Sequence, residues 1–445
     1  MRPTSLLFPA AAAFSLAAAE TSASVTFHRN IVPILQARCQ GCHRPGEIAP
    51  MALRTYDEVR PWVKAIKDAV IKRKMPPWTA DPKVGKFQND ASLTNSEIAT
   101  LTAWADGGAP EGEAKDAPPA RKFTEGGWTI GQPHLVIEMP KEYEVPPIGT
   151  IEYTYMIVPT GFREDRWVER IEVRPGNRSV VHHVTLYARP PESNWLREYP
   201  VGEAFVPERY HRRPGTSTGL SRGSALDGEI IGSFAPGRSP TPLVPGQARL
   251  IPANSDLILQ LHYTANGKPA KDRTKIGIIF ASQPPVERVL RTALGNRQFA
   301  IPPGASDHPV EADWTVLKEF RLISLGPHMH VRGKAMEVHA VYPTGEREVL
   351  VRVPRYDFNW QINYAFDKPR TIPAGTRFLV LAKFDNSPNN PSNPDPTAEV
   401  RWGDQTWEEM MHTWVEAAFE PAVDLTKVFA PTGSLPSRAA HGTTR

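Results

Sequence analysis

Proline recurs along this chain at a density that long helices do not tolerate. The sequence has 46 prolines among 445 residues, and a proline in a helix interior removes a backbone hydrogen bond and clashes with the preceding turn. Long helices are therefore disfavoured over most of the chain. Short strands joined by rigid turns suit the same composition, because proline is tolerated in turns and at strand edges.

The C-terminal two thirds of the chain have the pattern of a β-protein. Short β-branched and aromatic runs are separated by proline and glycine turns, as in "EYTYMIVP", "SVVHHVTLYARP", "DLILQLHYTANG" and "KIGIIFAS". This spacing is typical of β-sandwich or jelly-roll domains. We predict two such domains, residues 130–300 and 305–420, followed by a C-terminal tail over 421–445.

A short internal repeat supports the division into two related β-domains. "IPANSDLILQLHYTANG" begins at Ile251, and the similar "IPAGTRFLVLAKFDNS" begins at Ile372. His262 in the first copy stands where the second copy has Lys383. The two copies therefore differ at a potential metal ligand.

Residues 25–112 show the apolar spacing of helices instead of strands. Thr94 and Glu97 have the spacing of a capping box, and Gly107 is a predicted helix end. The polar, proline-rich stretch that follows predicts a linker over 113–129. Two further helical faces are formed by Ile31, Ile34 and Leu35 and by Val59, Val63, Ile66 and Val70.

The N-terminus has the pattern of a secretory signal peptide. Arg2 precedes an apolar stretch from Leu6 to Ala19, which ends in small residues and is too short to span a membrane. We predict a signal peptide over 1–19 and a periplasmic or secreted protein. No other apolar run approaches spanning length, so no membrane span is expected. The net charge of +4, without a lysine and arginine run, does not favour nucleic-acid binding.

Both cysteines of the chain lie in one motif, "CQGCH", which runs from Cys39 to His43. C-x-x-C-H is the attachment signal of c-type haem, in which two thiols bind the haem covalently and the histidine ligates the iron. A redox dithiol or a plain disulfide is the alternative. The adjacent histidine, the predicted export and the lack of other cysteines favour one haem c on Cys39, Cys42 and His43.

With this motif, residues 25–112 resemble the class I cytochrome c domain, which is small and all-α. The resemblance implies a methionine between the middle and last helices as the second axial ligand, and Met75 occupies that position. A thioether ligand raises the haem potential, as electron transfer requires. His28 is the rival ligand, although its place in the first helix favours a structural role.

Five histidines of the β-half have the spacing of metal ligands. They are His182, His183, His262, His328 and His330. Residues that alternate along a strand share a face, so His328 and His330 can bind one ion while Met329 points the other way. The adjacent pair His182 and His183 can do so only if its strand bulges or ends there. Imidazole suits zinc, copper, nickel or iron, whereas an added thioether selects copper; structural strand histidines are the alternative.

Four motifs resemble, in order, those of the copper type II ascorbate-dependent monooxygenases, the peptidylglycine α-hydroxylating and dopamine β-monooxygenases. They are "VVHHVTLY", "LQLHYT", "PHMHVRGK" and "EEMMHTW". The resemblance implies two copper ions, with Met411 a near rival to Met410 as the sulfur ligand. The implied all-histidine copper site comprises His182, His183 and His262. The implied catalytic, oxygen-binding copper site comprises His328, His330 and Met410.

The resemblance also implies an activity. The family inserts one atom of O2 into a C–H bond of an organic substrate, using two electrons from ascorbate that the two copper ions store. Here the cytochrome c-like domain lies on the same chain, and we expect it to feed the copper sites, replacing or supplementing ascorbate or another external redox protein. A non-catalytic copper and haem electron carrier is the alternative, as is a relative with one copper or none.

The chain departs from the peptide-hydroxylating branch at the substrate carboxylate clamp. The family's arginine before the His-x-His pair, and its asparagine and tyrosine after the methionine, are matched by Gly326, His412 and Trp414. A peptide ending in glycine is therefore not the expected substrate. His412 and Trp414 are predicted to line the substrate pocket instead.

Overall fold

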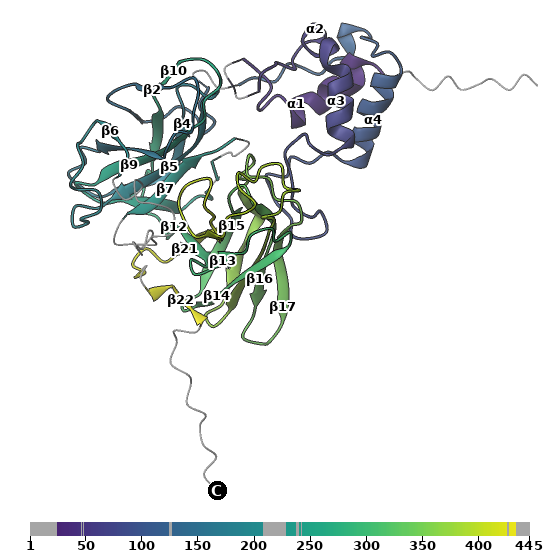
Figure 1. The fold of residues 1–445 in the computed structure, drawn as a ribbon. Helices are drawn as coiled ribbons and strands as arrows, with labels where there is room; N and C mark the ends of the chain where they lie inside the picture. The colour runs from purple at the N-terminus through teal and green to yellow at the C-terminus, as the bar shows by residue number, and fades with distance from the viewer. Residues whose placement is uncertain are drawn as a thin grey trace, which may run out of the picture.

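The structure is a computed structural model. It describes residues 25–45, 47, 49–123, 127–207, 228–236, 240–241, 243–424 and 427–432. The predicted signal peptide lies outside the described residues. The described part is mostly β-sheet, as the sequence predicted, and its α-helices are confined to the N-terminal segment (Figure 1). None of these helices has both the length and the apolarity needed to cross a membrane.

The N-terminal helices are short and pack around one apolar core. Thr94 and Glu97 form the predicted capping box at the start of α4, and Gly107 caps its end. Phe27 and Trp104 lie at the centre of the core, with ring centroids 5.9 Å apart. The helices are η1 (Phe27–Ile31), α1 (Val32–Arg38), α2 (Tyr56–Val59), η2 (Arg60–Trp62), α3 (Val63–Ile71), α4 (Asn95–Asp106) and η3 (Ala114–Asp116).

The strands follow from residue 135 onward. Those of the first half are β1 (Leu135–Glu138), β2 (Tyr143–Val145), β3 (Thr154–Pro159), β4 (Arg166–Arg174), β5 (Val181–Arg189), β6 (Ala204–Phe205), β7 (Glu229–Phe234), β8 (Gln247–Ile251), β9 (Asp256–Tyr263), β10 (Ala270–Asp272) and β11 (Lys275–Phe280). Those of the second half are β12 (Glu287–Gly295), β13 (Ala300–Ile301), β14 (His308–Val316), β15 (Phe320–His328), β16 (Gly333–Val341), β17 (Arg347–Val353), β18 (Tyr364–Ile372), β19 (Arg377–Phe384), β20 (Val400–Arg401), β21 (His412–Phe419) and β22 (Phe429–Pro431).

These strands build two β-sandwiches that share one long sheet. The eight-stranded sheet has the order β1-β11-β4-β8-β12-β21-β15-β18. Its first four strands share an apolar core with the five-stranded sheet β6-β3-β9-β5-β7, and its last four with the sheet β17-β16-β19-β14-β22. A short parallel pairing of β8 with β12 joins the two halves.

Two strands of the second sandwich come from outside the range predicted for it. β12 lies within the predicted first domain but pairs along its length with β21. β22 lies within the predicted C-terminal tail but pairs with β14. The second sandwich thus draws on residues on both sides of 305–420.

The two copies of the repeat occupy equivalent places. β9 carries the first copy and β19 the second, and each is the central strand of its five-stranded sheet. Apolar burial explains the shared pattern, since both strands pack against a sandwich core. At the position of difference, His262 is buried, whereas Lys383 is paired with Asp307 at the surface.

The chain between α3 and α4 ties the helical segment to the second sandwich. Trp78 packs edge-on against Tyr364 with centroids 5.0 Å apart, and Phe87 forms a β-bridge with Phe366. The backbone N–H of Gln88 donates to the carbonyl of Ala365 at 2.9 Å. The helices therefore gather at one corner of the molecule, beside the strands (Figure 1).

Candidate metal centres

The first histidine cluster lies on two neighbouring strands of the first sandwich. His182 and His183 are in β5, and His183 pairs directly with His262 of β9. The register of the pairing shifts between Val181 and His183. This irregularity confirms the bulge that the sequence demanded if both adjacent imidazoles were to face one ion. One ring nitrogen of each histidine lies within 4.8 Å of the other two.

The ring nitrogens of this cluster are placed as metal ligands. Nδ1 of His182 and Nδ1 of His183 are 3.1 Å apart, which suits two nitrogens each about 2 Å from one ion. Nε2 of His182 and Nδ1 of His262 are buried and have no hydrogen-bond partner among the described residues. Burial lowers the pKa of His182 to about 4 and that of His262 to about 3. The imidazoles are therefore neutral at pH 7, as metal binding requires.

The second cluster forms where β15 ends. His328 is the last residue of the strand, and its ring centroid lies 5.4 Å from that of His330. Nδ1 of His328 contacts Oε1 of Gln361, and Nδ1 of His330 contacts the carbonyl of Glu408, both at 3.1 Å. A ligating histidine commonly donates its other ring N–H in this way. Nε2 of His330 is then the free ligand atom, and it is buried without a partner among the described residues.

A buried carboxylate holds the backbone around this cluster. Glu409 accepts hydrogen bonds from the backbone N–H groups of His330 at 2.8 Å, Arg332 at 2.7 Å and Met410 at 3.2 Å. Burial raises the pKa of Glu409 to about 8, against the opposing effect of these donors. One side chain thus ties the His-x-His segment to the segment that carries the predicted sulfur ligand.

The methionines near this cluster separate into two environments. Met329 and Met411 are fully buried in the apolar core of the second sandwich. Met410 is half-buried. Successive side chains of an extended chain point to opposite sides, which places Met410 on the same side as His412 and away from the core.

His412, predicted as a pocket residue, joins the second cluster. It pairs with His328 across β21 and β15, and the two rings stack with centroids 4.7 Å apart. Its side chain is buried, and neither ring nitrogen has a hydrogen-bond partner among the described residues. Trp414 meets the ring of His412 edge-on at 4.5 Å. His412 is therefore stacked on a predicted ligand, but the ring nitrogens of His328, His330 and His412 do not converge as those of the first cluster do.

The two clusters face each other across one aromatic ring. Phe358, in the loop between β17 and β18, stacks on His182 with centroids 5.0 Å apart. The same ring meets His330 at 5.7 Å. Sequence reasoning missed Phe358 and Gln361, because neither is a metal ligand type and their loop has no motif. The positions of both depend on tertiary contacts alone.

The CxxCH motif follows α1 directly. Cys39 caps the helix, and the backbone N–H groups of Cys42 and His43 both donate to its carbonyl. Nδ1 of His43 lies 3.3 Å from the carbonyl of Met51. If this bond fixes the tautomer, Nε2 is left for an iron atom. These residues therefore fit a covalent haem. Met75 lies in the chain between α3 and α4, half-buried.

The thiols do not have the character of a redox dithiol. Burial raises the pKa of Cys39 to about 12, and it also raises the pKa of Cys42. Catalytic C-x-x-C motifs instead lower the pKa of a thiol, because the thiolate is the reactive form. The environment of the motif thus favours a structural or covalent role over disulfide exchange.

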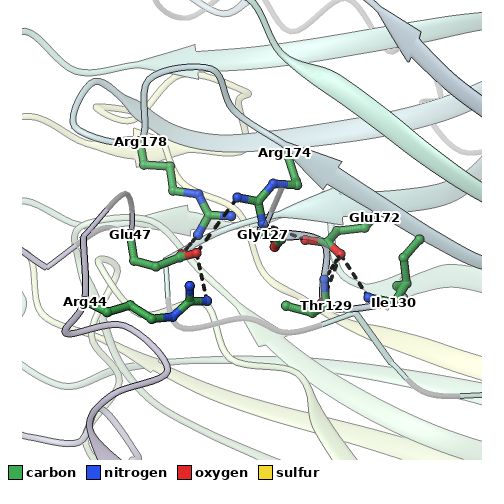
Figure 2. Close-up of polar contacts among 8 residues, drawn as sticks. All are labelled: Arg44, Glu47, Gly127, Thr129, Ile130, Glu172, Arg174 and Arg178. Atoms are coloured by element: carbon green, nitrogen blue, oxygen red, sulfur yellow. Dashed lines mark hydrogen bonds and ion pairs between the residues drawn. The ribbon is translucent and has the colours of Figure 1, made fainter. Parts of the chain in front are cut away.

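A buried ion network lies beside the motif (Figure 2). Glu47, with a side chain only 5% exposed, pairs with Arg44 at 2.9 Å, with Arg178 more closely, and with Arg174 at 3.9 Å. Arg174 and Arg178 belong to β4 and to the turn that leads into β5. The positive charges of Arg178 and Arg44 also act on Cys42. The network therefore joins the CxxCH loop to the chain that enters the first histidine cluster.

A neighbouring carboxylate secures the chain that leaves the predicted linker. Glu172 accepts hydrogen bonds from the backbone N–H groups of Thr129, at 2.6 Å, and Ile130, at 3.2 Å. It also pairs with Arg174 at 3.2 Å, and Arg174 in turn donates to the carbonyl of Gly127 (Figure 2). Arg174 is thus shared between the two carboxylates of the junction.

Comparison with known proteins gives no family assignment. No family model matches the chain, and no curated protein matches it. Among solved structures, it is similar to the VP2 subviral particle of infectious bursal disease virus, at 10% identity over 65% of this chain and 73% of that chain, with a TM-score of 0.18. A structure of the Gx strain of that virus matches at 7% identity over 67% and 75%, with a TM-score of 0.19. Likeness at this level carries no argument about function.

The first prediction concerns metal content. The sequence predicts two copper ions per chain. If copper fills the first cluster, replacing His183 or His262 with alanine should lower the copper content by one ion per chain, because each residue supplies one of three converging nitrogens. Gln361→Leu should instead weaken copper binding at the second cluster by about 10–100-fold, since it orients His328. The measurement is copper per chain after dialysis. His308→Ala, outside both clusters, is the control, and unchanged copper in the His183 variant would refute the first site.

The second prediction concerns pH. Burial holds the pKa values of His182, His262 and His330 at about 4, 3 and 4, below the ordinary 6.5. Below pH 6.5 the unfolded chain therefore binds more protons than the folded chain. The contribution of these histidines to the free energy of unfolding is complete above pH 6.5 and is lost as the pH falls toward about 4. Thermal unfolding of metal-free protein should show this loss, and His262→Gln should reduce it. A melting temperature independent of pH over this range would contradict the burial of neutral imidazoles.

Proposed function

We propose that this chain is an exported, haem- and copper-containing monooxygenase that hydroxylates a C–H bond of an organic substrate with O2. The observation that carries the proposal is the pair of buried imidazole clusters that face each other across Phe358. Each cluster has ring nitrogens without hydrogen-bond partners among the described residues. Buried polar atoms normally have partners, and a bound ion would supply one for Nε2 of His330. Nε2 of His182 is not explained in this way, because Nδ1 of that ring is the atom beside His183.

The donor sets support copper over other metals. The first cluster offers three converging imidazoles. The second offers the imidazoles of His328 and His330, with that of His412 stacked on His328, and Met410 would add a thioether. A thioether is a soft ligand that favours Cu(I) over zinc or iron. Copper held at the two clusters would supply one electron each for the reduction of O2. Gln361 and the carbonyl of Glu408 orient His328 and His330, and Phe358 packs against one ring of each cluster.

The helical segment is the proposed source of electrons. Cys39, Cys42 and His43 would bind one haem c, with Met75 as the second axial ligand, as in the class I cytochromes c that this segment resembles. Support comes from the place of the motif, since the ion pairs of Glu47 hold it beside Arg178, four residues before His182. Ascorbate or a separate redox protein would then reduce the haem of the helical segment or the copper sites.

The proposal predicts oxygen chemistry that depends on both modules. Copper-loaded protein given a reductant and its substrate should consume O2 in proportion to hydroxylated product. Cys39→Ala with Cys42→Ala should abolish turnover with a reductant that acts through the haem and leave copper content unchanged. His328→Ala should abolish product with any reductant. Copper and haem that cycle between redox states without any product from a broad substrate screen would instead indicate an electron carrier.

A further prediction tests the path of electrons from the helical segment to the first cluster. Glu47→Gln removes the carboxylate that Arg44 and Arg178 share and leaves Arg174 paired with Glu172 alone. Breaking a buried ion pair in this way costs about 3–5 kcal/mol. The junction should loosen, and stopped-flow absorbance of the haem should show slower electron loss to copper. Asp68→Asn, which breaks an exposed pair with Lys72 on the same helical segment, is the matched control. Equal rates in the two variants would argue against this path.

A further inference from the structure

A cavity of about 520 Å³ lies against the long sheet, and its lining does not include His412 or Trp414. Its walls include Arg249 of β8, Arg291 of β12 and Glu416 of β21. His412, Trp414 and Glu416 alternate along β21 and so point to the same side. This volume is within the range of pockets that bind small organic molecules.

The interior of the cavity carries more positive than negative charge. Five ionisable residues line it, and two of them, Glu169 and Arg170, pair with each other at an exposed rim. Buried inside are two guanidinium groups and the single carboxylate of Glu416. One positive charge therefore lacks a negative partner among the residues of the lining.

The hydrogen bonds of these groups are also incomplete. Arg249 uses Nη2 to bind Oε1 of Glu416 at 2.6 Å, and Arg291 uses Nη1 to bind Oγ of Ser233 at 3.0 Å. Nη1 of Arg249 and Nε of Arg291 are buried and have no partner among the described residues. Water could meet these hydrogen-bonding needs, but it could not balance the charge.

Glu416 is already engaged and cannot neutralise a second arginine. Its Oε1 binds Arg249, and its Oε2 accepts from Oγ of Ser324 at 2.7 Å. Burial would raise the pKa of Glu416, but Arg249 and Arg291 hold it at about 2, so the group is ionised. Burial lowers the pKa of Arg291 to about 10, which still leaves its guanidinium charged at pH 7.

Arg291 connects the cavity to the second histidine cluster. Its guanidinium lies 5.0 Å from the ring centroid of Trp414, and Trp414 in turn contacts His412. The neighbouring strand has no space for a side chain at Gly326, because a Cβ at this position would lie 2.7 Å from Oδ1 of Asn363. An arginine at Gly326 would therefore clash, and Arg291 reaches the same face from β12.

We infer that this cavity binds a small organic carboxylate, whose charge pairs with Arg291 and Arg249 close to the ring of Trp414. The inference names the substrate class of the proposed monooxygenase and rests on that function only for the fate of the ligand. Binding itself needs neither metal nor haem. A carboxylate suits two guanidinium groups because it accepts paired, charge-assisted hydrogen bonds.

Isothermal titration of the full-length protein without copper tests this directly. Benzoate and hexanoate are the probes, and their uncharged amides, benzamide and hexanamide, are the matched controls. At least one carboxylate should bind with a 1:1 stoichiometry and at least about tenfold more tightly than its amide, because only the anion balances the buried charge. Failure of both carboxylates to bind better than their amides overturns the inference.

Variants locate the binding. Arg291→Gln should weaken carboxylate binding at least about tenfold, and Arg291→Lys should retain part of it. Arg321→Gln removes a charge from the neighbouring strand β15 but lies outside the cavity lining, so binding should be unchanged. Equal binding by the Arg291→Gln and Arg321→Gln proteins would place the carboxylate elsewhere. If Arg291→Gln does not fold, the comparison of each acid with its amide in the unaltered protein still decides.

The result is separable from the proposed function. Copper binding and O2 consumption without any preference for carboxylates would overturn only the substrate class. Saturable carboxylate binding that Arg291→Gln abolishes, in a protein that takes up no copper, would support the cavity as an anion site and overturn the monooxygenase.

Discussion

The rest of the structure depends on how the buried imidazole rings of the two histidine clusters are held. A buried donor or acceptor without a partner costs about 1–3 kcal/mol, and several ring nitrogens here have none among the described residues. Neighbouring groups orient these rings but do not form hydrogen bonds with those nitrogens. The bulge in β5 turns His182 and His183 toward one point, and Gln361 and Glu409 fix the other cluster. Bound cations, as proposed, would complete these clusters.

The arrangement of the two sandwiches brings the two histidine clusters together. Strand β12 pairs with β21 and also touches β8, so one sheet runs from the first half into the second. Phe358 then lies between His182 and His330. The helical segment is fixed against both halves, through Glu47 on one side and through Trp78 and Phe87 on the other. All three candidate metal sites are thereby held in one arrangement by buried contacts.

Local features of the fold could be predicted from the sequence, because their causes are local. The capping box of α4 needs only Thr94 and Glu97, and strand alternation alone places Met329 in the core. The need for a bulge at His182 and His183 followed from strand geometry. The place of β12 could not be predicted, since its apolar pattern fits either sandwich and only the pairing with β21 decides between them.

The same limit applies to the candidate sites. His412 was predicted to line the substrate pocket, but it does not line the cavity described above. Its stacking on His328 depends on the register between β21 and β15, which no local pattern reveals. Phe358 and Arg291 carried no signal, because an aromatic residue in a loop and an arginine in a strand are ordinary in sequence. Their significance arises only from what surrounds them, namely two histidine clusters in one case and a cavity with excess positive charge in the other.

Stability alone does not account for the charged groups of that cavity. A buried set of two arginines and one glutamate can often be replaced by apolar residues without loss of stability, because desolvation of the charges offsets their attraction. Arg249, Arg291 and Glu416 also fail to complete one another, which makes the set a poor stabilising element. A ligand that carries one negative charge would complete it. The groups that destabilise the empty cavity are therefore the groups that would select its occupant, and their contact with Trp414 orients that selection toward the second histidine cluster.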